Sequence, residues 1–286
     1  MPCETHIDCD NQSLSVEDLI RKLVRTDSNG CPALNTTGGT FAPPPLDGLS
    51  FKNDAAGYFV SDAETITSMN SVISGASKKF SIALWVKISD ITLGTILTDG
   101  VNYFPLQLYF DSTGGGTLYI SFVTGLGLDF TTWKSTAGAI AANTWAHIVV
   151  EWDFSQIQAL RASMYINGII NAITVSATGG TGVGTSLSTG TEYWLMAENG
   201  PTPADMILAD FAIYNGNLNA LEVLELYNGG TPIDPTTVAT EASWTHWYFP
   251  ANAVFGVNWT MTNEITAGED FVSTGLAADD RILDYP

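Results

Sequence analysis

The sequence is short of positive charge. Its 286 residues include 10 lysines and arginines against 30 aspartates and glutamates, so the formal net charge is −20 at pH 7. Nucleic-acid binding needs a basic surface, so this class is excluded, and binding to an anionic membrane is disfavoured for the same reason. Charged residues of both signs make up only 14% of the chain, about half of the ordinary share. The surface must therefore be completed by serine, threonine, asparagine and glycine, as is common in extracellular and virion β proteins.

Long apolar runs are also missing. No stretch reaches the roughly 18 consecutive apolar residues of a membrane-spanning helix. The first residues, MPCETHIDCDNQ, have neither the basic nor the apolar segment of a signal peptide. We therefore expect either the mature form of an exported protein or a protein that leaves its cell by another route, such as assembly into a virus particle.

Cysteine is rare, with three in the chain. Cys3, His6, Cys9 and Cys31 form the one metal-like cluster in the sequence, and their spacing around a helix could close a tetrahedral zinc site. The cluster has no C-x2-C pair, and Cys31 is far from the others. A disulfide between two of the three cysteines, or three unpaired thiols, are the alternatives.

Residues 1–45 are predicted to form an N-terminal arm. Ser15 is suited to cap an amphipathic helix, Gly30 lies past its end, and the apolar residues between them recur at helical spacing. A single helix of this length is marginal alone, so it must pack on its own domain, a sister subunit or a larger assembly. The following segment, TTGGTFAPPPLDG, is typical of a linker.

Residues 46–230 show short apolar strands separated by glycine, asparagine and serine. One of them, WAHIVVEWDF, alternates between an apolar face and a face that carries Glu151 and Asp153. After the last strand, Asn219 and Glu222 have the spacing of a helix capping box, and Gly229-Gly230 is a helix stop. Many strands with one helix at the end predict an all-β sandwich.

Five segments in order resemble the laminin G-like, concanavalin A-like lectin/glucanase domains. They are DAAGYFV (54–60), FSIALWVK (80–87), NTWAHIVVEWD (143–153), MYINGI (164–169) and LADFAIYNGNLNALEVLELYNGG (208–230). The resemblance implies two antiparallel sheets curved into a jelly roll, with a domain over residues 46–230. Residues 231–286 then form a C-terminal aromatic-rich extension, similar to segments that follow such domains in phage and marine virus structural proteins. Trp244 and Trp247 are expected to dock this extension.

The glucanases of this superfamily carry a Glu-x-Asp-x-Glu strand that supplies the nucleophile and the general acid. Here Glu151 and Asp153 match its first two positions, but Ser155 replaces the second catalytic glutamate. Glycoside hydrolysis needs two catalytic carboxylates, and this strand then lacks one of them. We therefore interpret the pair as part of a solvated strand face.

Asp210 is an acid inside an apolar strand, and a buried carboxylate needs a partner. The resemblance implies a structural calcium ion, held by Asp210 together with oxygens of the turn at residues 53–57. Hydrogen bonds from backbone amides to Asp210 are the alternative.

Three aromatic residues, Tyr103, Tyr109 and Trp133, are predicted to lie on or beside loops. Because relatives of this fold bind sugars on aromatic platforms, they are the candidate ligand-binding residues, with a protein interface as the alternative. In contrast, Trp152 falls on a strand and is assigned to the core.

The sequence predicts a non-enzymatic virion surface protein, such as a capsid decoration or fibre subunit, with a lectin-like sandwich facing solvent. The arm and the extension would contact capsid proteins or sister subunits in a homo-oligomer, and surface glycans are a further partner. A secreted, calcium-dependent carbohydrate-binding or adhesion domain is the second hypothesis, and a glycoside hydrolase is the third.

Overall fold

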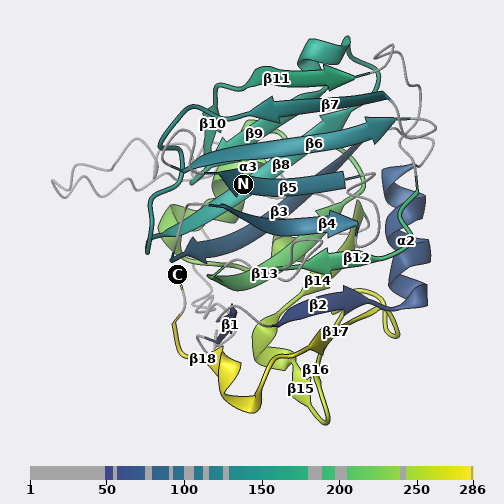
Figure 1. Ribbon diagram of the computed structural model, residues 1–286, viewed down its shortest axis with the longest axis vertical. Helices are drawn as coiled ribbons and strands as arrows, with labels where there is room; N and C mark the ends of the chain where they lie inside the picture. The colour runs from purple at the N-terminus through teal and green to yellow at the C-terminus, as the bar shows by residue number, and fades with distance from the viewer. Residues whose placement is uncertain are drawn as a thin grey trace, which may run out of the picture. The chain divides into compact units, whose positions relative to one another are not determined.

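The computed structural model describes residues 49–53, 57–74, 79–89, 93–99, 106–111, 116–124, 129–179, 189–196, 205–238, 243–284 and 286. Two antiparallel sheets face each other across one core (Figure 1). This confirms the predicted all-β, two-sheet antiparallel sandwich. The N-terminal arm, its helix and its cysteines lie outside the described residues.

The first sheet has eight strands. They are β1 (Ser50–Asn53), β3 (Lys79–Ile88), β8 (Trp145–Asp153), β9 (Ala162–Ile166), β10 (Ile169–Asn171), β13 (Met206–Tyr214), β14 (Trp244–Tyr248) and β18 (Arg281–Ile282). Their order is β10-β9-β8-β3-β13-β1-β18, and β14 also pairs with β13.

The second sheet has ten strands. They are β2 (Tyr58–Ser61), β4 (Leu93–Asp99), β5 (Leu106–Asp111), β6 (Thr117–Thr124), β7 (Asp129–Lys134), β11 (Thr174–Gly179), β12 (Tyr193–Leu195), β15 (Val254–Phe255), β16 (Trp259–Thr262) and β17 (Asp270–Thr274). Their order is β11-β7-β6-β5-β4-β12-β2-β17-β16-β15.

The core between the sheets follows from the alternation of strand side chains. On β8, Ile148, Val150 and Trp152 point inward and are buried, as their spacing predicts. Trp152 contacts Trp133 of β7 edge-to-face, with ring centroids 5.0 Å apart. This tryptophan pair is a contact between the two sheets within the core.

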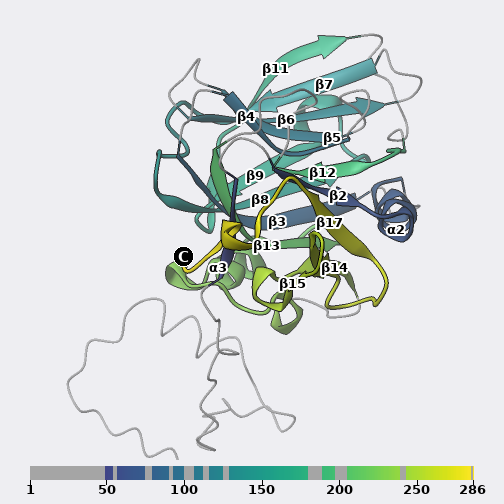
Figure 2. The same ribbon diagram turned by 60° about the horizontal axis from the view of Figure 1, so that its bottom comes forward.

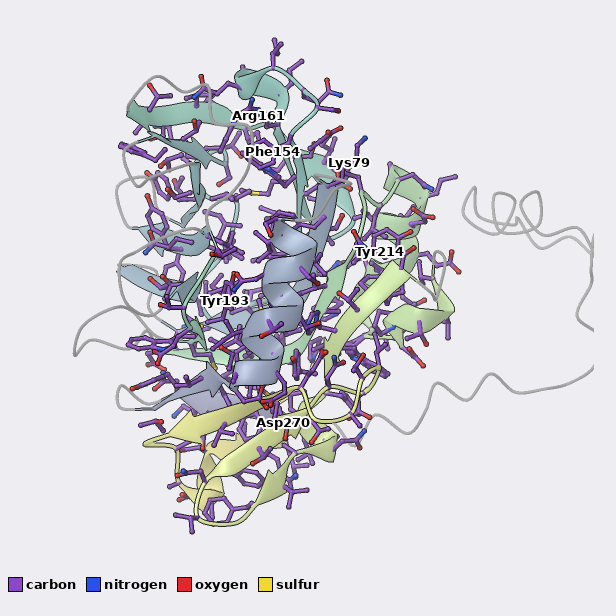
Figure 3. The ribbon with its side chains drawn as sticks, turned by 90° about the vertical axis from the view of Figure 1, so that its right-hand side faces the viewer. Lys79, Phe154, Arg161, Tyr193, Tyr214 and Asp270 are labelled. Carbon is purple, nitrogen blue, oxygen red and sulfur yellow. The ribbon has the colours of Figure 1, made fainter. Side chains whose placement is uncertain are left out.

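Helix α2 (Ala63–Ile73) lies at one side of the sandwich, between the two layers (Figure 3). Asp62 caps its N-terminus by accepting a hydrogen bond from the Thr65 backbone N–H at 2.7 Å. Met69, Val72 and Ile73 form its buried face. Within the described residues, no helix is long and apolar enough to cross a membrane.

Helix α3 (Ala220–Tyr227) confirms the predicted capping box. The Asn219 side chain accepts from the Glu222 N–H at 3.1 Å, and Glu222 accepts from the Asn219 N–H at 2.7 Å. The helix ends at Tyr227, and its C-cap Asn228 has a left-handed φ of 44°, so the stop begins one residue before the predicted glycines. Five 3-10 turns complete the description: Gln158–Leu160, Asn228–Gly230, Pro235–Thr237, Pro250–Asn252 and Ala278–Asp280.

Helix α3 covers the outer face of the eight-stranded sheet. Val223 and Leu226 of the helix pack against Val149 of β8 and Ala83 of β3 in a second apolar cluster. Trp244 extends this cluster toward β14. Both faces of the central strands of this sheet are therefore buried, which explains why β3 and β13 are apolar at nearly every position.

The C-terminal segment completes both sheets, so the predicted domain boundary at Gly230 needs correction. β14 pairs with β13 in one sheet, and β17 pairs with β2 in the other (Figure 2). Residues 43–286 form one compact unit, which includes the predicted extension 231–286. The predicted docking of this segment through Trp244 and Trp247 is confirmed, because both lie on β14 in register with β13.

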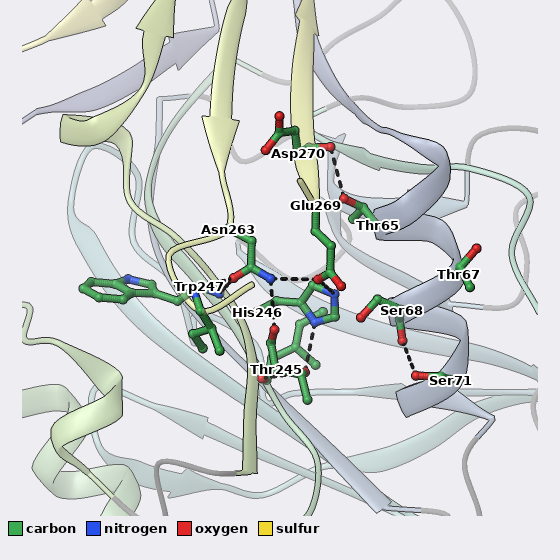
Figure 4. A network of polar contacts seen from close by, with 12 residues as sticks. Thr65, Thr67, Ser68, Ser71, Thr245, His246, Trp247, Asn263, Glu269 and Asp270 are labelled. Carbon is green, nitrogen blue, oxygen red and sulfur yellow. Dashed lines mark hydrogen bonds and ion pairs between the residues drawn. The ribbon is translucent and has the colours of Figure 1, made fainter. Parts of the chain in front are cut away.

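A polar network links β14 to the loop before β17 (Figure 4). Asn263 donates to the Thr245 carbonyl at 3.0 Å and accepts from the Trp247 N–H at 3.0 Å. The Nε2 atom of His246 lies 3.2 Å from Glu269 Oε2, but burial lowers the pKa of His246 to about 4. At neutral pH this contact therefore joins a neutral imidazole to a carboxylate rather than two opposite charges.

Candidate functional site

The outer face of the ten-stranded sheet carries polar and aromatic side chains. On β5, Leu106 and Leu108 point into the core, so Gln107 and Tyr109 point outward. Strand register joins such residues into two neighbouring rows, Trp194–Thr98–Gln107–Ser121–Thr132 and Thr95–Tyr109–Tyr119–Lys134–Thr174. These two rows, with Tyr58 of β2, are called the hydroxyl-aromatic face.

Two aromatic pairs stand on this face. Tyr58 and Trp194 have ring centroids 5.0 Å apart, and Tyr109 stacks on Tyr119 at 4.9 Å with 10° between the planes. Strand β4 separates the pairs. The strand spacing and a two-residue offset place Trp194 and Tyr109 roughly 12 Å apart along the surface. An oligosaccharide spans such a distance, whereas a monosaccharide does not.

Polar groups lie between and beside the rings. The Ser121 and Thr132 hydroxyl oxygens are 3.0 Å apart across neighbouring strands. Trp194 Nε1 donates to Glu192 at 3.0 Å, which fixes the indole ring. Gln107 of the first row is half-buried.

Tyr119 and four hydroxyl residues of the rows are buried, namely Thr95, Thr98, Ser121 and Thr132. The half-buried rings of Tyr58, Tyr109 and Trp194 and the amide of Gln107 are therefore the groups open to a ligand. Flat rings beside an amide match a ligand that has both C–H faces and hydroxyls.

The predicted ligand residues have different outcomes. Tyr109 lies on the hydroxyl-aromatic face, although on strand β5 rather than a loop, and its role in binding stays a prediction. Trp133 lies on β7 and is fully buried against Trp152, so its assignment to a loop platform is corrected. Its neighbours Thr132 and Lys134 hold the outward positions instead. Tyr103 lies outside the described residues.

Sequence reasoning missed Tyr58, Tyr119 and Trp194 on this face. The signal was present in TLYISFVT, where Leu118 and Ile120 alternate with Tyr119 and Ser121. The alternation separates two faces, but it does not show which face is the core when both contain large side chains.

Glu151 and Asp153 lie on the covered outer face of the eight-stranded sheet, so the interpretation as a solvated strand face is corrected. Glu151 is 5% exposed and Asp153 is 7% exposed. Burial opposes ionisation of Asp153, but hydrogen bonds from Ser155 and Lys79 outweigh it and lower the pKa to about 2. Ser155 donates to Asp153 through its N–H at 2.8 Å and its hydroxyl at 2.6 Å, so it closes the turn after β8.

Glu151 has the opposite environment. Burial raises its pKa to about 7, the Leu218 N–H partly offsets this by favouring the charged form, and the nearby Glu222 carboxylate adds to the rise. Its Oε1 atom is buried without a hydrogen-bond partner. A carboxyl with a raised pKa is a common general acid, but this one lies in the sheet face that packs against α3.

Replacement of Glu151 by glutamine is expected to remove a pH dependence of stability. A folded-state pKa of about 7 above the ordinary 4.5 means that the neutral carboxyl favours folding and that this contribution is lost as the pH rises through 7. The Glu151→Gln variant should match the wild type at about pH 4, below the ordinary pKa, and exceed its free energy of unfolding at pH 8 by about 1–3 kcal/mol. Urea unfolding at both pH values measures the difference, and equal stability at pH 8 would contradict the raised pKa.

Asp210 lies at the point on β13 where the strand that pairs with one edge of β13 changes from β1 to β14. β1 pairs with β13 up to Leu208, and β14 pairs with it from Phe211 onward. Between them Asp210 forms a bulge against β3, with a φ of 43° that aspartate tolerates better than most residues. Its side chain is 9% exposed and accepts a hydrogen bond from Trp247 Nε1 at 3.4 Å. Calcium and backbone amides as further partners of Asp210 stay predictions.

The predicted calcium site lies only partly within the described residues, because residues 54–56 of its turn are outside them, and the ion stays a prediction. Asn53 is opposite Met206 on β13, four residues from Asp210, so the two sites are about 13 Å apart along the strand. The Asn53 side chain instead bonds to the carbonyls of Gly57 and Met196, which fixes the end of β1. In the described part of the chain, no three His, Cys, Asp or Glu side chains form a group that could hold a metal ion. Cys3, His6, Cys9 and Cys31 lie outside that part.

Comparison with known proteins places the chain by family and fold. Residues 61–224, more than half of the chain, match the family Laminin_G_3, described as the concanavalin A-like lectin/glucanases superfamily. The sequence has no significant match among curated proteins.

Among solved structures, a candidate carbohydrate-binding protein from Bacteroides ovatus has 11% identity and a TM-score of 0.51, over 80% of this chain and 58% of that one. The chain thus spans little more than half the length of that relative. A SAP-like pentraxin from Limulus polyphemus has 15% identity and a TM-score of 0.43, over 69% of this chain and 89% of that one. The binding domain of botulinum neurotoxin serotype C1 has 15% identity and a TM-score of 0.42, over 63% and 42%.

The family match includes β3, β8 and β13, the strands that carried the resemblance in the sequence, and the Bacteroides structure shares the fold of most of the chain. The chain therefore belongs to the concanavalin A-like lectin/glucanases superfamily.

Proposed function

We propose that this protein is a non-enzymatic carbohydrate-binding module that holds an oligosaccharide on its hydroxyl-aromatic face. The observation that carries the proposal is the placement of two aromatic pairs on one outer sheet face, with the half-buried amide of Gln107 beside them. The description of the Bacteroides relative as a candidate carbohydrate-binding protein agrees with it.

Burial of the acidic pair supports binding without hydrolysis. Glu151 and Asp153 are the residues that match the glucanase strand, and they lie on the sheet that α3 covers, not on the hydroxyl-aromatic face. Asp153 is also held by Lys79 at 2.9 Å. A glycoside hydrolase needs two carboxyls that flank the same glycosidic bond, so this pair does not meet the requirement.

Loss of either aromatic pair is expected to weaken glycan binding. Trp194→Ala and Tyr109→Ala should each reduce affinity about tenfold, because each removes a half-buried ring that would stack on a sugar. Phe255→Ala is the matched control, since Phe255 is an exposed aromatic residue on the edge strand of the same sheet. Isothermal titration with the best oligosaccharide from a glycan array measures the affinities.

Three results would overturn the proposal: no glycan bound by the wild-type protein, unchanged affinity in both variants, or an equal loss in Phe255→Ala. Release of reducing ends from a bound glycan, with loss of this turnover in Glu151→Gln, would favour a hydrolase instead. Repetition of the titration with EDTA tests the predicted calcium dependence.

The location on a virion surface, with capsid or sister subunits as partners, is a separate part of the prediction. It was inferred in part from two extensions of the sandwich, but the C-terminal one is folded into both sheets. Of the two extensions, residues 1–45 therefore remain as the predicted assembly contact. A secreted adhesion module uses the same glycan-binding face without that assembly.

A further inference from the structure

Lys134 is an unusual cation in this protein. Among the basic side chains that the structure describes, the others have partners: Lys79 and Lys87 pair with carboxylates, while Arg161 and Arg281 bond to carbonyls and lie over aromatic rings. Lys52 also has a bonding partner. Of this described set, the Lys134 side chain alone has no hydrogen bond, ion pair or ring contact with another described residue. An unpaired ammonium is notable in a chain with three acidic residues for each basic one.

Lys134 stands at one end of the hydroxyl-aromatic face. It is the cross-strand neighbour of Tyr119, which in turn is the neighbour of Tyr109. Such neighbours have Cβ atoms about 5 Å apart, so the ammonium reaches a group bound beside the tyrosine pair. Glu192 lies at the opposite end, beside Trp194, with β4, β5 and β6 between β12 and β7.

From this placement we propose that the site takes an acidic glycan, namely a neutral oligosaccharide that carries one carboxylate sugar. Its neutral rings would lie along Trp194 and Tyr109, and Lys134 would bind the carboxylate beside Tyr119. This inference rests on the proposed function and specifies its ligand class. The acidic ligand is inferred because the unpaired Lys134 stands at one end of the hydroxyl-aromatic face. An ammonium binds a carboxylate more strongly than it binds a neutral hydroxyl.

The charge of the whole protein limits the number of acidic groups. With a net charge of −20, the chain repels a long polyanion such as a heavily sulfated polysaccharide. One lysine compensates one carboxylate of a short ligand. We therefore expect the preference to hold for single-acid oligosaccharides and to be absent for polyanions.

The test uses the full chain and an array in which each neutral oligosaccharide stands beside the same oligosaccharide with one uronic or sialic acid. The best pair is then titrated by calorimetry in about 50 mM salt. The Debye screening length is then roughly 14 Å, so contacts between exposed charges are preserved. The wild type should bind the acidic member about fivefold more tightly. Lys134→Gln should lose this preference and keep its affinity for the neutral member, while Lys134→Arg should retain the preference. Lys52→Gln is the control, because it removes one positive charge from β1 of the other sheet. This variant should behave as the wild type.

The outcomes separate this inference from the proposed function. Equal binding of neutral and acidic members by the wild type, or a preference that persists in Lys134→Gln, overturns the acidic ligand and leaves the carbohydrate-binding module intact. Tighter binding of a heavily sulfated polysaccharide than of the single-acid ligand also overturns it. If the wild type binds no member of the array, both the module and its acidic ligand are overturned.

Discussion

A chain that ends at Gly230 is expected not to form a folded sandwich. The truncation removes β14 from β13 and β17 from β2, so a strand of each sheet loses its partner. It also removes Trp244, Tyr248 and Phe271, which are 0–2% exposed. Each buried aromatic ring contributes about 3–5 kcal/mol to the free energy of unfolding. An ordinary domain has a total stability of about 5–15 kcal/mol, so the loss of three rings is as large as the stability of a whole domain at the low end of this range.

Circular dichroism and size-exclusion chromatography measure this outcome. The truncated chain should lack a cooperative thermal transition and should aggregate through the exposed strand edges. A chain that ends at Ala277 is the matched control, since it keeps β14 to β17 and loses β18 together with the contact of Asp284 with Lys87. That control should fold with a modest loss of stability. Cooperative unfolding of the chain that ends at Gly230 would instead support a domain boundary there.

Replacement of Trp133 by alanine is expected to lower the free energy of unfolding by about 3–5 kcal/mol, because the cavity lies between two sheets that cannot close around it. Trp133 is fully buried and meets Trp152 edge-to-face at 5.0 Å, so the variant also loses this ring contact. Urea unfolding should show an earlier midpoint with an unchanged slope.

Tyr109→Ala is the control for Trp133→Ala, because Tyr109 lies near Trp133 but on the opposite face of the same sheet. Its stability should change by less than about 1 kcal/mol, while its glycan affinity falls. The two variants thus separate a core residue from a binding residue. A Trp133→Ala variant with wild-type stability and weakened glycan binding would restore the assignment of Trp133 to a ligand platform.

Several elements were predictable because their signals are local. The apolar runs of β3, β8 and β13 predict strands by composition, and the capping box at Asn219 and Glu222 predicts α3 by hydrogen-bonding chemistry between near neighbours. These signals need no knowledge of what packs against them. The structure confirms each of them within a few residues.

Helix α2 was missed although its cap is also local. Asp62 precedes Ala63 and Glu64, which is a start signal, but the helix has one short buried face of Met69, Val72 and Ile73 among polar residues. Its stability comes from packing between the two sheets, which the sequence does not show. The same limit applies to Asp210, where a change of neighbouring strand produces the bulge.

Composition and local pattern were enough to predict the class of the fold and the strands that build it, and the excess of acid predicts that nucleic acids are not partners. The face that each strand presents to the core became clear from its tertiary contacts alone. Alternation divides side chains into two sets, but register and the position of α3 decide that Trp133 and Glu151 are buried while Tyr109 and Lys134 lie on an outer face. The C-terminal strands close both sheets for the same reason, since pairing over long sequence distances leaves no local signal.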